Sequence, residues 1–194
     1  MSMPEATFSQ ASSQLVARSK AGDREAFAKL YDEYFAVIYR FVFLKLRHKE
    51  TSEDIAQNVF LKALSAIGTF EERGLPFSSW LYKIARNLCL DYFKKKSDVV
   101  VAEPEIFFPN IADEKMTAEE SFDLQERVGR LLRAIDSLSD EQKEIVIMRF
   151  VQELSYEEIS KILDKSEESL RAQNYRAMKK LKIILKEHGE TGLG

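Results

Sequence analysis

The 194-residue chain is poor in the residues that interrupt helices. It contains 7 glycines and 4 prolines, too few for the turns of a many-stranded sandwich or barrel and for a glycine-rich phosphate-binding loop. Hydrophobic residues make up 45% of the chain and charged residues 31%, the mixture of a folded globular protein. The composition therefore predicts an all-α fold with room for two small domains.

Residues that build metal and nucleophilic sites are also scarce. The chain has one cysteine, Cys89, and two histidines, His48 and His188, which lie far apart. A single cysteine excludes an internal disulfide and a multi-thiolate metal site, which indicates a reducing compartment. No HExxH pair, Cys-His cluster or GxSxG elbow is present. We therefore expect no enzyme activity, no cofactor and no bound metal.

Long apolar runs are missing as well. The N-terminal sequence MSMPEATFSQASSQ has neither a basic nor an apolar stretch, and no later run approaches the roughly 18 apolar residues of a membrane span. The formal net charge of −3 indicates no particular partner. The sequence predicts a cytoplasmic protein without membrane insertion.

A change of composition divides the chain into two blocks. Between residues 97 and 123 acidic residues are frequent, lysine occurs once and two prolines interrupt any helical period. This composition predicts an extended acidic linker. Because residues 15–96 and residues 124–187 each carry amphipathic patterns, we expect two small helical domains.

The N-terminal block carries three amphipathic helical patterns, in which apolar residues recur every three or four positions. Thr51 and Asp54 resemble a capping box that opens the second helix, in which Leu64 is predicted to point inward. Glycine and proline mark residues 70–79 as a loop. The third helix then covers residues 80–96.

This third helix has a polar face that suits unpaired nucleotides. Its members share one side because they are three or four residues apart: Lys83, Asn87, Asp91 and Lys94, with Arg86 beside them. Cations can bind phosphates, and nearby aromatic rings such as Phe77 and Trp80 can receive bases. A solvated surface beside a core-packed tryptophan explains the pattern equally well.

The C-terminal block has the pattern of a helix-turn-helix. Two capping boxes, each a serine followed three residues later by Gln or Glu, fix helix starts. A short helix at residues 155–163 is followed by a break at Asp164 and Lys165 and by a longer helix at residues 167–186.

The longer helix is strongly basic. From Arg171 to Lys186 it carries basic residues and no acid, which is the electrostatic footprint of a phosphate backbone. Near its start, Arg171, Gln173 and Asn174 have donors and acceptors suited to base edges in a major groove. A solvated basic helix end is the alternative, but these cations begin in the first turns, where the helix dipole disfavours them. DNA binding is therefore favoured.

Short motifs in both blocks follow one another in a recognisable order. In the first block they are Gly22-Asp23, Glu53-Asp54-Ile55-Ala56-Gln57 and Trp80-Leu81-Tyr82-Lys83-Ile84-Ala85-Arg86-Asn87, and in the second Leu154-Ser155-Tyr156-Glu157-Glu158-Ile159 and Arg176-Ala177. In order and spacing the chain resembles a bacterial sigma factor of the extracytoplasmic-function (ECF) group, within the sigma-70 family. The resemblance covers about residues 21–185.

The resemblance implies a sigma region 2-like domain followed by a region 4-like helix-turn-helix domain, which together bind core RNA polymerase and direct promoter-specific initiation. The residues implied to dock on the clamp coiled coil are Asp54, Gln57 and Asn58, and the polymerase flap is a second contact. Those implied to bind the minus-10 element and stabilise its opened strand are Phe77, Trp80, Lys83, Arg86, Asn87 and Lys94. Those implied to bind the minus-35 duplex are Ser169, Arg171, Gln173, Asn174, Tyr175, Arg176 and Lys179.

Three positions depart from the family pattern. The family usually has glycine at the helix-turn-helix break and an apolar residue after it, where this chain has Asp164 and Lys165. It also usually has an apolar residue where this chain has Asn174. Either the recognition helix is rotated, or Asn174 is partly buried and hydrogen-bonded, or minus-35 reading is weakened.

Two other classes of function stay open at this stage. One is a free-standing helix-turn-helix regulator that binds duplex DNA without polymerase, and the other is an enzyme acting on nucleic acid. An anti-sigma factor or another DNA-placing protein also stays open as a further partner.

Overall fold

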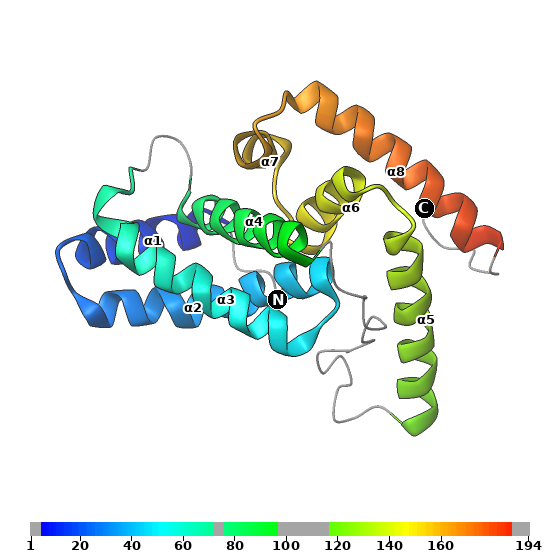
Figure 1. Ribbon diagram of the computed structural model, residues 1–194, viewed down its shortest axis with the longest axis horizontal. Coiled ribbons are helices and arrows are strands. Elements are labelled where there is room, and N and C mark those ends of the chain that lie inside the picture. The colour runs from blue at the N-terminus through cyan, green and yellow to red at the C-terminus, as the bar shows by residue number, and fades with distance from the viewer. Residues whose placement is uncertain (1–4, 72–75, 97–116, 188–194) are drawn as a thin grey trace.

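The structure, a computed structural model, describes residues 5–71, 76–96 and 117–187, which contain helices and turns but no strand (Figure 1). The first part contains α1 (Glu5–Lys20), α2 (Arg24–Leu46), α3 (Lys49–Ala66), a 3-10 turn η1 (Ile67–Thr69) and α4 (Phe77–Lys96). The second contains α5 (Ala118–Asp136), α6 (Asp140–Val146), a π-helical turn η2 (Ile147–Val151), α7 (Tyr156–Leu163) and α8 (Glu167–Glu187). The predicted all-α fold is confirmed.

Helix α1, which packs against α2, has no counterpart among the predicted helices. Its inward face includes two buried serines, Ser12 and Ser19, which interrupt the apolar period. The hydroxyl of Ser12 donates to the Glu33 carboxylate at 2.9 Å and lies 2.8 Å from the Tyr34 hydroxyl. Polar contacts therefore hold part of a helix face that a hydrophobic pattern does not reveal.

The start of α3 differs from the prediction. His48 is the N-cap, and its Nδ1 accepts a hydrogen bond from the Thr51 amide at 3.3 Å, so Thr51 lies inside the helix rather than capping it. The predicted inward position of Leu64 is also wrong, because its side chain is 49% exposed. Phe60 and Ala63 fill the core at this turn instead.

Helix α5 begins inside the segment that the sequence predicts as a linker. Thr117 caps it: its Oγ1 accepts from the Glu120 amide at 3.2 Å, and the Glu120 carboxylate accepts from the Thr117 amide at 2.8 Å. Glu119 and Glu120 are therefore first-turn residues, where the helix dipole favours acidic side chains. The rest of the predicted linker, residues 97–116, lies outside the described residues.

The helix-turn-helix is formed by α7 and α8 (Figure 1). Both predicted capping boxes are present, because Ser139 and Ser155 each accept from the backbone amide three residues later. Asp164 ends α7 in the left-handed conformation, with φ 55° and ψ 50°. Aspartate enters this region more readily than most residues, which explains how the chain turns there without glycine.

The two parts of the chain pack against each other. Helix α4 contacts α7, α2 contacts η2, and one hydrophobic cluster includes Phe41 from the first part and Met148 and Ile159 from the second. Between the two parts, the Tyr82 hydroxyl donates to the Gln152 side-chain oxygen at 2.7 Å. In the described residues the two parts therefore pack together, and we call this the closed arrangement.

Candidate polymerase and DNA surfaces

Helix α3 presents a face of mixed polar and apolar character. Asp54, Gln57 and Asn58 are all exposed, and the helical period places Leu61, which is 64% exposed, on the same side. Leu64 extends the apolar part of this face. We call these five residues the α3 face. Exposed leucines that lie together mark interaction surfaces. The sequence signal that places Leu61 on the same side of α3 as Asp54 is their separation of seven residues, or two helical turns.

Phe77 does not occupy the position expected for a base-binding residue. Its side chain is 2% exposed, and its ring centroid lies 5.6 to 5.7 Å from those of Tyr34, Phe70 and Trp80. A base cannot stack on a ring that is enclosed on this scale. The structure corrects the sequence expectation: Phe77 anchors one end of the loop, and Trp80, which is only partly buried, flanks it.

The other end of this loop is held from a distant helix. Lys20 at the end of α1 donates from Nζ to the Phe70 carbonyl oxygen at 2.7 Å. Sequence reasoning missed this contact because 50 residues separate the two partners. Residues 72–75 of the loop lie outside the described residues.

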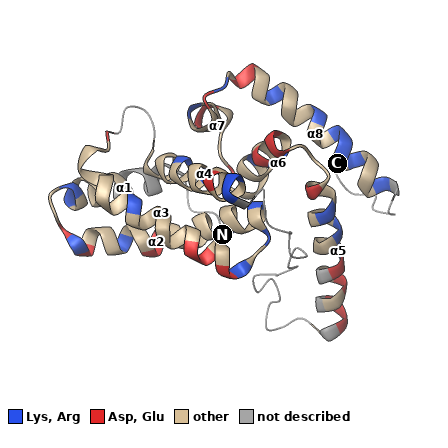
Figure 2. Ribbon diagram, viewed as in Figure 1, with Lys and Arg blue, Asp and Glu red and all other residues tan. Residues whose placement is uncertain are grey.

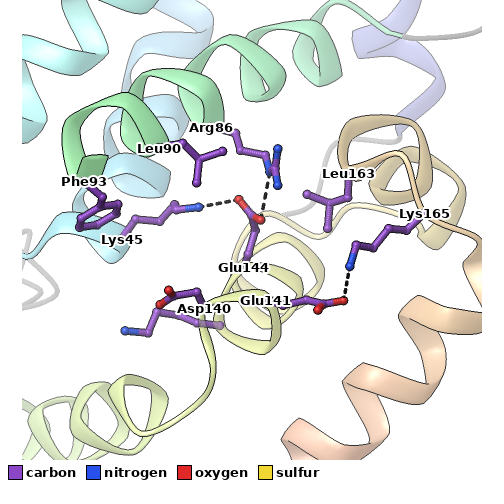
Figure 3. A pocket seen from close by; sticks show the side chains of 10 residues that line it. Lys45, Arg86, Leu90, Phe93, Asp140, Glu141, Glu144, Leu163 and Lys165 are labelled. Carbon is purple, nitrogen blue, oxygen red and sulfur yellow. Dashed lines mark hydrogen bonds and ion pairs between the residues drawn. The ribbon is translucent and has the colours of Figure 1, made fainter. Parts of the chain in front are cut away.

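The polar face of α4 is divided between solvent and the C-terminal part. Lys83, Asn87 and Lys94 are exposed as predicted. Arg86 is not: its Nε donates to the Glu144 carboxylate of α6 at 3.1 Å, and its side chain is 27% exposed. The other Glu144 oxygen accepts from Lys45 of α2 (Figure 3). Glu144 thus binds cations on two helices of the N-terminal part.

This ion-pair cluster lies in the wall of a cavity of about 400 Å³ between the two parts (Figure 3). Its lining residues are Lys45, Arg86, Leu90 and Phe93 from the N-terminal part and Asp140, Glu141, Lys143, Glu144, Leu163 and Lys165 from the C-terminal part. Each basic residue of the wall has a carboxylate partner, Glu144 for Lys45 and Arg86, Asp136 for Lys143, and Glu141 for Lys165. The four basic residues of the wall thus share three carboxylates, and each of them already has an ion-pair partner.

Helix α8 carries basic side chains along its length after an acidic first turn (Figure 2). The predicted minus-35 residues that are exposed are Ser169, Arg171, Tyr175, Arg176 and Lys179, whereas Gln173 is partly buried. Tyr175 is 71% exposed, an unusual position for an aromatic ring without a partner surface. The outer side of α8 thus combines cations with an aromatic ring.

Asn174 faces the protein interior. It is 8% exposed, and its Nδ2 donates to the Tyr156 hydroxyl at 2.8 Å. Its Oδ1 is buried and has no hydrogen-bond partner among the described residues. The structure selects the interpretation in which Asn174 is buried, with one half of its amide bonded, and corrects the expectation that it reads a base.

The lone cysteine is a core residue. Cys89 is fully buried in α4, and burial raises the pKa of its thiol to about 12. A thiol that stays protonated at neutral pH is a poor nucleophile.

Within the described ranges, no cluster of three or more His, Cys, Asp or Glu side chains could hold a metal ion. None of the helices described there is long and apolar enough to span a membrane.

Comparison with known families assigns both parts of the chain. The family model for Sigma-70 region 2 matches residues 30–99, and the model for Sigma-70 region 4 matches residues 129–181. The chain belongs to the sigma-70 family. The first match contains the α3 face and α4, and the second contains α7 and α8 as far as residue 181. Both candidate surfaces of this sigma factor therefore lie in family regions.

Relatives of known group place this sigma factor among the ECF proteins. It is 36% identical over 173 residues to the ECF RNA polymerase sigma factor BldN of Streptomyces coelicolor, a match that covers 89% of this chain and 65% of the relative. It is 29% identical over 169 residues to the ECF sigma factor SigX of Bacillus subtilis, with 86% and 84% covered.

Solved structures share the fold of this sigma factor. CnrH in complex with the cytosolic domain of CnrY has a TM-score of 0.70 at 18% identity, with 91% of this chain and 98% of CnrH covered. RpoE of Bartonella quintana, solved with the anti-sigma factor NepR, has a TM-score of 0.67 at 22% identity, with 82% and 96% covered.

Proposed function

We propose that this sigma factor docks on the clamp coiled coil of core RNA polymerase through the α3 face and contacts the flap through its C-terminal domain. The exposed carboxylate and amide of Asp54 and Gln57 supply polar contacts. Leu61 supplies apolar area that docking removes from water. The docked chain directs polymerase to promoters.

In this proposal α4 and the loop before it bind the minus-10 element. Lys83 and Lys94 bind phosphates, and Asn87 supplies an amide beside them. The loop that runs from Phe70 to the start of α4 at Phe77 tests a base that has left the stack, and both of its ends are anchored. The opened strand is stabilised by these contacts.

The proposal assigns the minus-35 duplex to the outer side of α8. Arg171, Gln173 and Tyr175 approach base edges near the start of the helix. Ser169, Arg176 and Lys179 contact phosphates, which fix the register of the helix on the duplex. Asn174 has no direct contact with DNA in this scheme.

The closed arrangement adds a condition to DNA binding. Arg86 lies on the face of α4 assigned to the minus-10 element, but Glu144 already binds it. The two parts therefore separate before Arg86 reaches a phosphate. An inhibitory protein of the anti-sigma kind, such as the one solved with the Bartonella structure, is included among the partners.

The proposed activity is recognition without catalysis. It needs no cofactor, and it places the chain in the cytoplasm, where polymerase and promoter DNA are. The buried and protonated Cys89 has no part in it.

The observation that carries the proposal is the α3 face. A free-standing helix-turn-helix regulator binds DNA without polymerase and has no use for exposed leucines beside Asp54 and Gln57. The test is copurification with core polymerase of a charge-reversed variant, Asp54→Lys with Gln57→Lys. Exposed sites tolerate such changes within about 0.5 kcal/mol, so the helical spectrum should be retained while polymerase binding is lost.

A matched control separates a local effect from one of net charge. Ala28→Lys with Asp32→Lys adds the same charge to exposed positions one turn apart on α2. The control should copurify like the wild type. Equal retention of both variants on polymerase would reject the α3 face as the docking surface, and failure of the wild type itself to copurify would favour the free-standing regulator.

A further inference from the structure

Tyr156 is the first residue of α7, and both ends of its side chain contact α8. The guanidinium carbon of Arg171 lies 4.4 Å from the centroid of its ring, and its hydroxyl accepts a hydrogen bond from Asn174 Nδ2 at 2.8 Å. Arg149 of η2 approaches the same ring at 5.4 Å. One aromatic side chain thus joins the two helices of the helix-turn-helix.

The backbone that carries Tyr156 is itself fixed. The capping box that opens α7 joins Ser155 and Glu158 through three hydrogen bonds of 2.8 to 3.2 Å. Because the capping box fixes the backbone at the start of α7, the Cα position and the Cα–Cβ direction of Tyr156 are also fixed. It can therefore act as a fixed platform for a side chain of the neighbouring helix.

The guanidinium of Arg171 is held although the side chain is 60% exposed. It lies over the Tyr156 ring on one side, and its Nη2 contacts the Glu167 carboxylate at 2.9 Å. A long arginine side chain normally loses much rotamer freedom when it binds. Holding the guanidinium before DNA arrives removes part of that loss while leaving N–H donors for the duplex.

Asn174 explains how the ring is kept in place. It lies one turn after Arg171 on the buried stripe that includes Leu170 and Ala177. A leucine at this position would pack against the ring but could not bond to the hydroxyl. The Asn174 amide lowers the stability of the domain through its Oδ1, which is buried without a partner among the described residues. Its Nδ2, however, fixes the outer end of the Tyr156 side chain.

We propose that Tyr156 is a positioning residue for minus-35 recognition: its ring holds the Arg171 guanidinium in the orientation that reads the duplex, and Asn174 holds its hydroxyl. This inference rests on the proposed function, in which Arg171 approaches base edges. It also gives a role to the departure from the family pattern at Asn174.

The test uses the full chain with core polymerase and a promoter library randomised in the minus-35 element. Arg171→Ala should lose preference at the base pairs that Arg171 reads. Tyr156→Leu should weaken preference at those same base pairs by roughly two- to fivefold, the range of an exposed cation–π contact. Tyr156→Phe keeps the ring and should retain most of the preference. Combining Tyr156→Leu with Arg171→Ala should add nothing at these base pairs, because the two residues act as one unit.

Several results would overturn the inference. One is a loss of affinity in Tyr156→Leu that is equal for all minus-35 sequences. A second is a loss of preference in Tyr156→Leu that adds to the loss in Arg171→Ala. Another is an equal loss in Tyr156→Phe, which would mean that the ring does not by itself position the Arg171 guanidinium. If Tyr156→Leu folds poorly, the melting temperature of Tyr156→Phe is measured to show that this variant is folded, and the comparison is made with it.

Further variants separate this inference from the proposed function. If Arg171→Ala changes nothing while Arg176→Ala and Lys179→Ala weaken minus-35 binding, α8 still binds the duplex and only the role of Tyr156 is rejected. If none of the three matters, the assignment of α8 to the minus-35 element fails with it.

Discussion

Arg86 of α4 and Glu144 of α6 form an ion pair between the two parts of the chain, with Nε and Oε2 3.1 Å apart (Figure 3). Lys45 of α2 binds the other carboxylate oxygen, and the Glu144 side chain is 8% exposed. One carboxylate is therefore shared by two cations where water is largely excluded. Such a group has a large effect when it is removed, because the cations stay behind.

Glu144→Gln should open the closed arrangement. The substitution keeps the size of the side chain but leaves Lys45 and Arg86 without a counter-charge, at a cost of roughly 3 kcal/mol to the closed form. In the proposed function the two parts separate, so the chain should become more extended instead of unfolding. Small-angle X-ray scattering should report a larger radius of gyration, and fragments carrying an opened minus-10 strand should bind more tightly.

Glu141→Gln on the same helix is the matched control. Its partner Lys165 is 39% exposed, and such surface pairs contribute about 0 to 1 kcal/mol. The control should keep the wild-type radius of gyration. If Glu144→Gln also kept it, the ion pair would not be what holds the two parts together.

Interactions between residues close in sequence can be predicted from the sequence, whereas interactions between distant residues cannot. The capping boxes at Ser139 and Ser155 were predictable because all their partners lie within three residues. The pair of Arg86 with Glu144 was not, because 58 residues separate the partners and their approach depends on how the two parts pack. The exposure of Lys83 and Asn87 follows from helical period alone.

The sequence predictions differ from the structure where the same residue pattern fits both a buried and an exposed environment. Phe77 and Trp80 both read as aromatic residues beside a loop, but only packing decides that Phe77 is enclosed and Trp80 partly open. A histidine cap is rarer than a Ser or Thr cap, so the sequence pattern favours Thr51 over His48 as the cap. Asn174 was recognised as a departure, but its partner Tyr156 could be found only in the structure.

Asp164→Gly should stabilise the C-terminal domain. Asp164 adopts φ 55°, a conformation that glycine enters without steric cost. The substitution also removes a negative charge from a helix C-terminus, where the dipole disfavours it. We expect a gain of about 0.5–1 kcal/mol in the free energy of unfolding, measured by thermal denaturation. Asp164→Ala, which keeps the Cβ and removes the charge, should instead lower or leave unchanged the melting temperature, and a higher value for alanine than for glycine would reject the backbone argument.

Cys89 should be inert in the folded protein and should make stability fall in alkali. Its thiol pKa is raised by burial from an ordinary 9.0 to about 12, so the folded state keeps a proton that the unfolded state loses. The resulting stabilisation is complete below the ordinary pKa and declines as the pH rises toward the folded value. The stability difference between the wild type and Cys89→Ala should therefore narrow above pH 9, and a thiol reagent should label the native protein only through unfolding. Rapid labelling of the native chain at pH 8 would contradict the buried position.

Lys83→Ala should weaken promoter binding without changing base preference. Lys83 is exposed on α4, so its removal should alter the free energy of unfolding by no more than about 0.5 kcal/mol. A lysine acts on DNA as a point charge toward phosphate, and phosphates are the same in every sequence. All promoters in a randomised minus-10 library should therefore lose affinity similarly, and the slope of log affinity against log salt should fall by about 1. Lys29→Ala, which removes an equal charge from an exposed site on α2, should leave the slope unchanged. A change of minus-10 preference in Lys83→Ala would mean that this lysine reads a base and that the loop does not act alone.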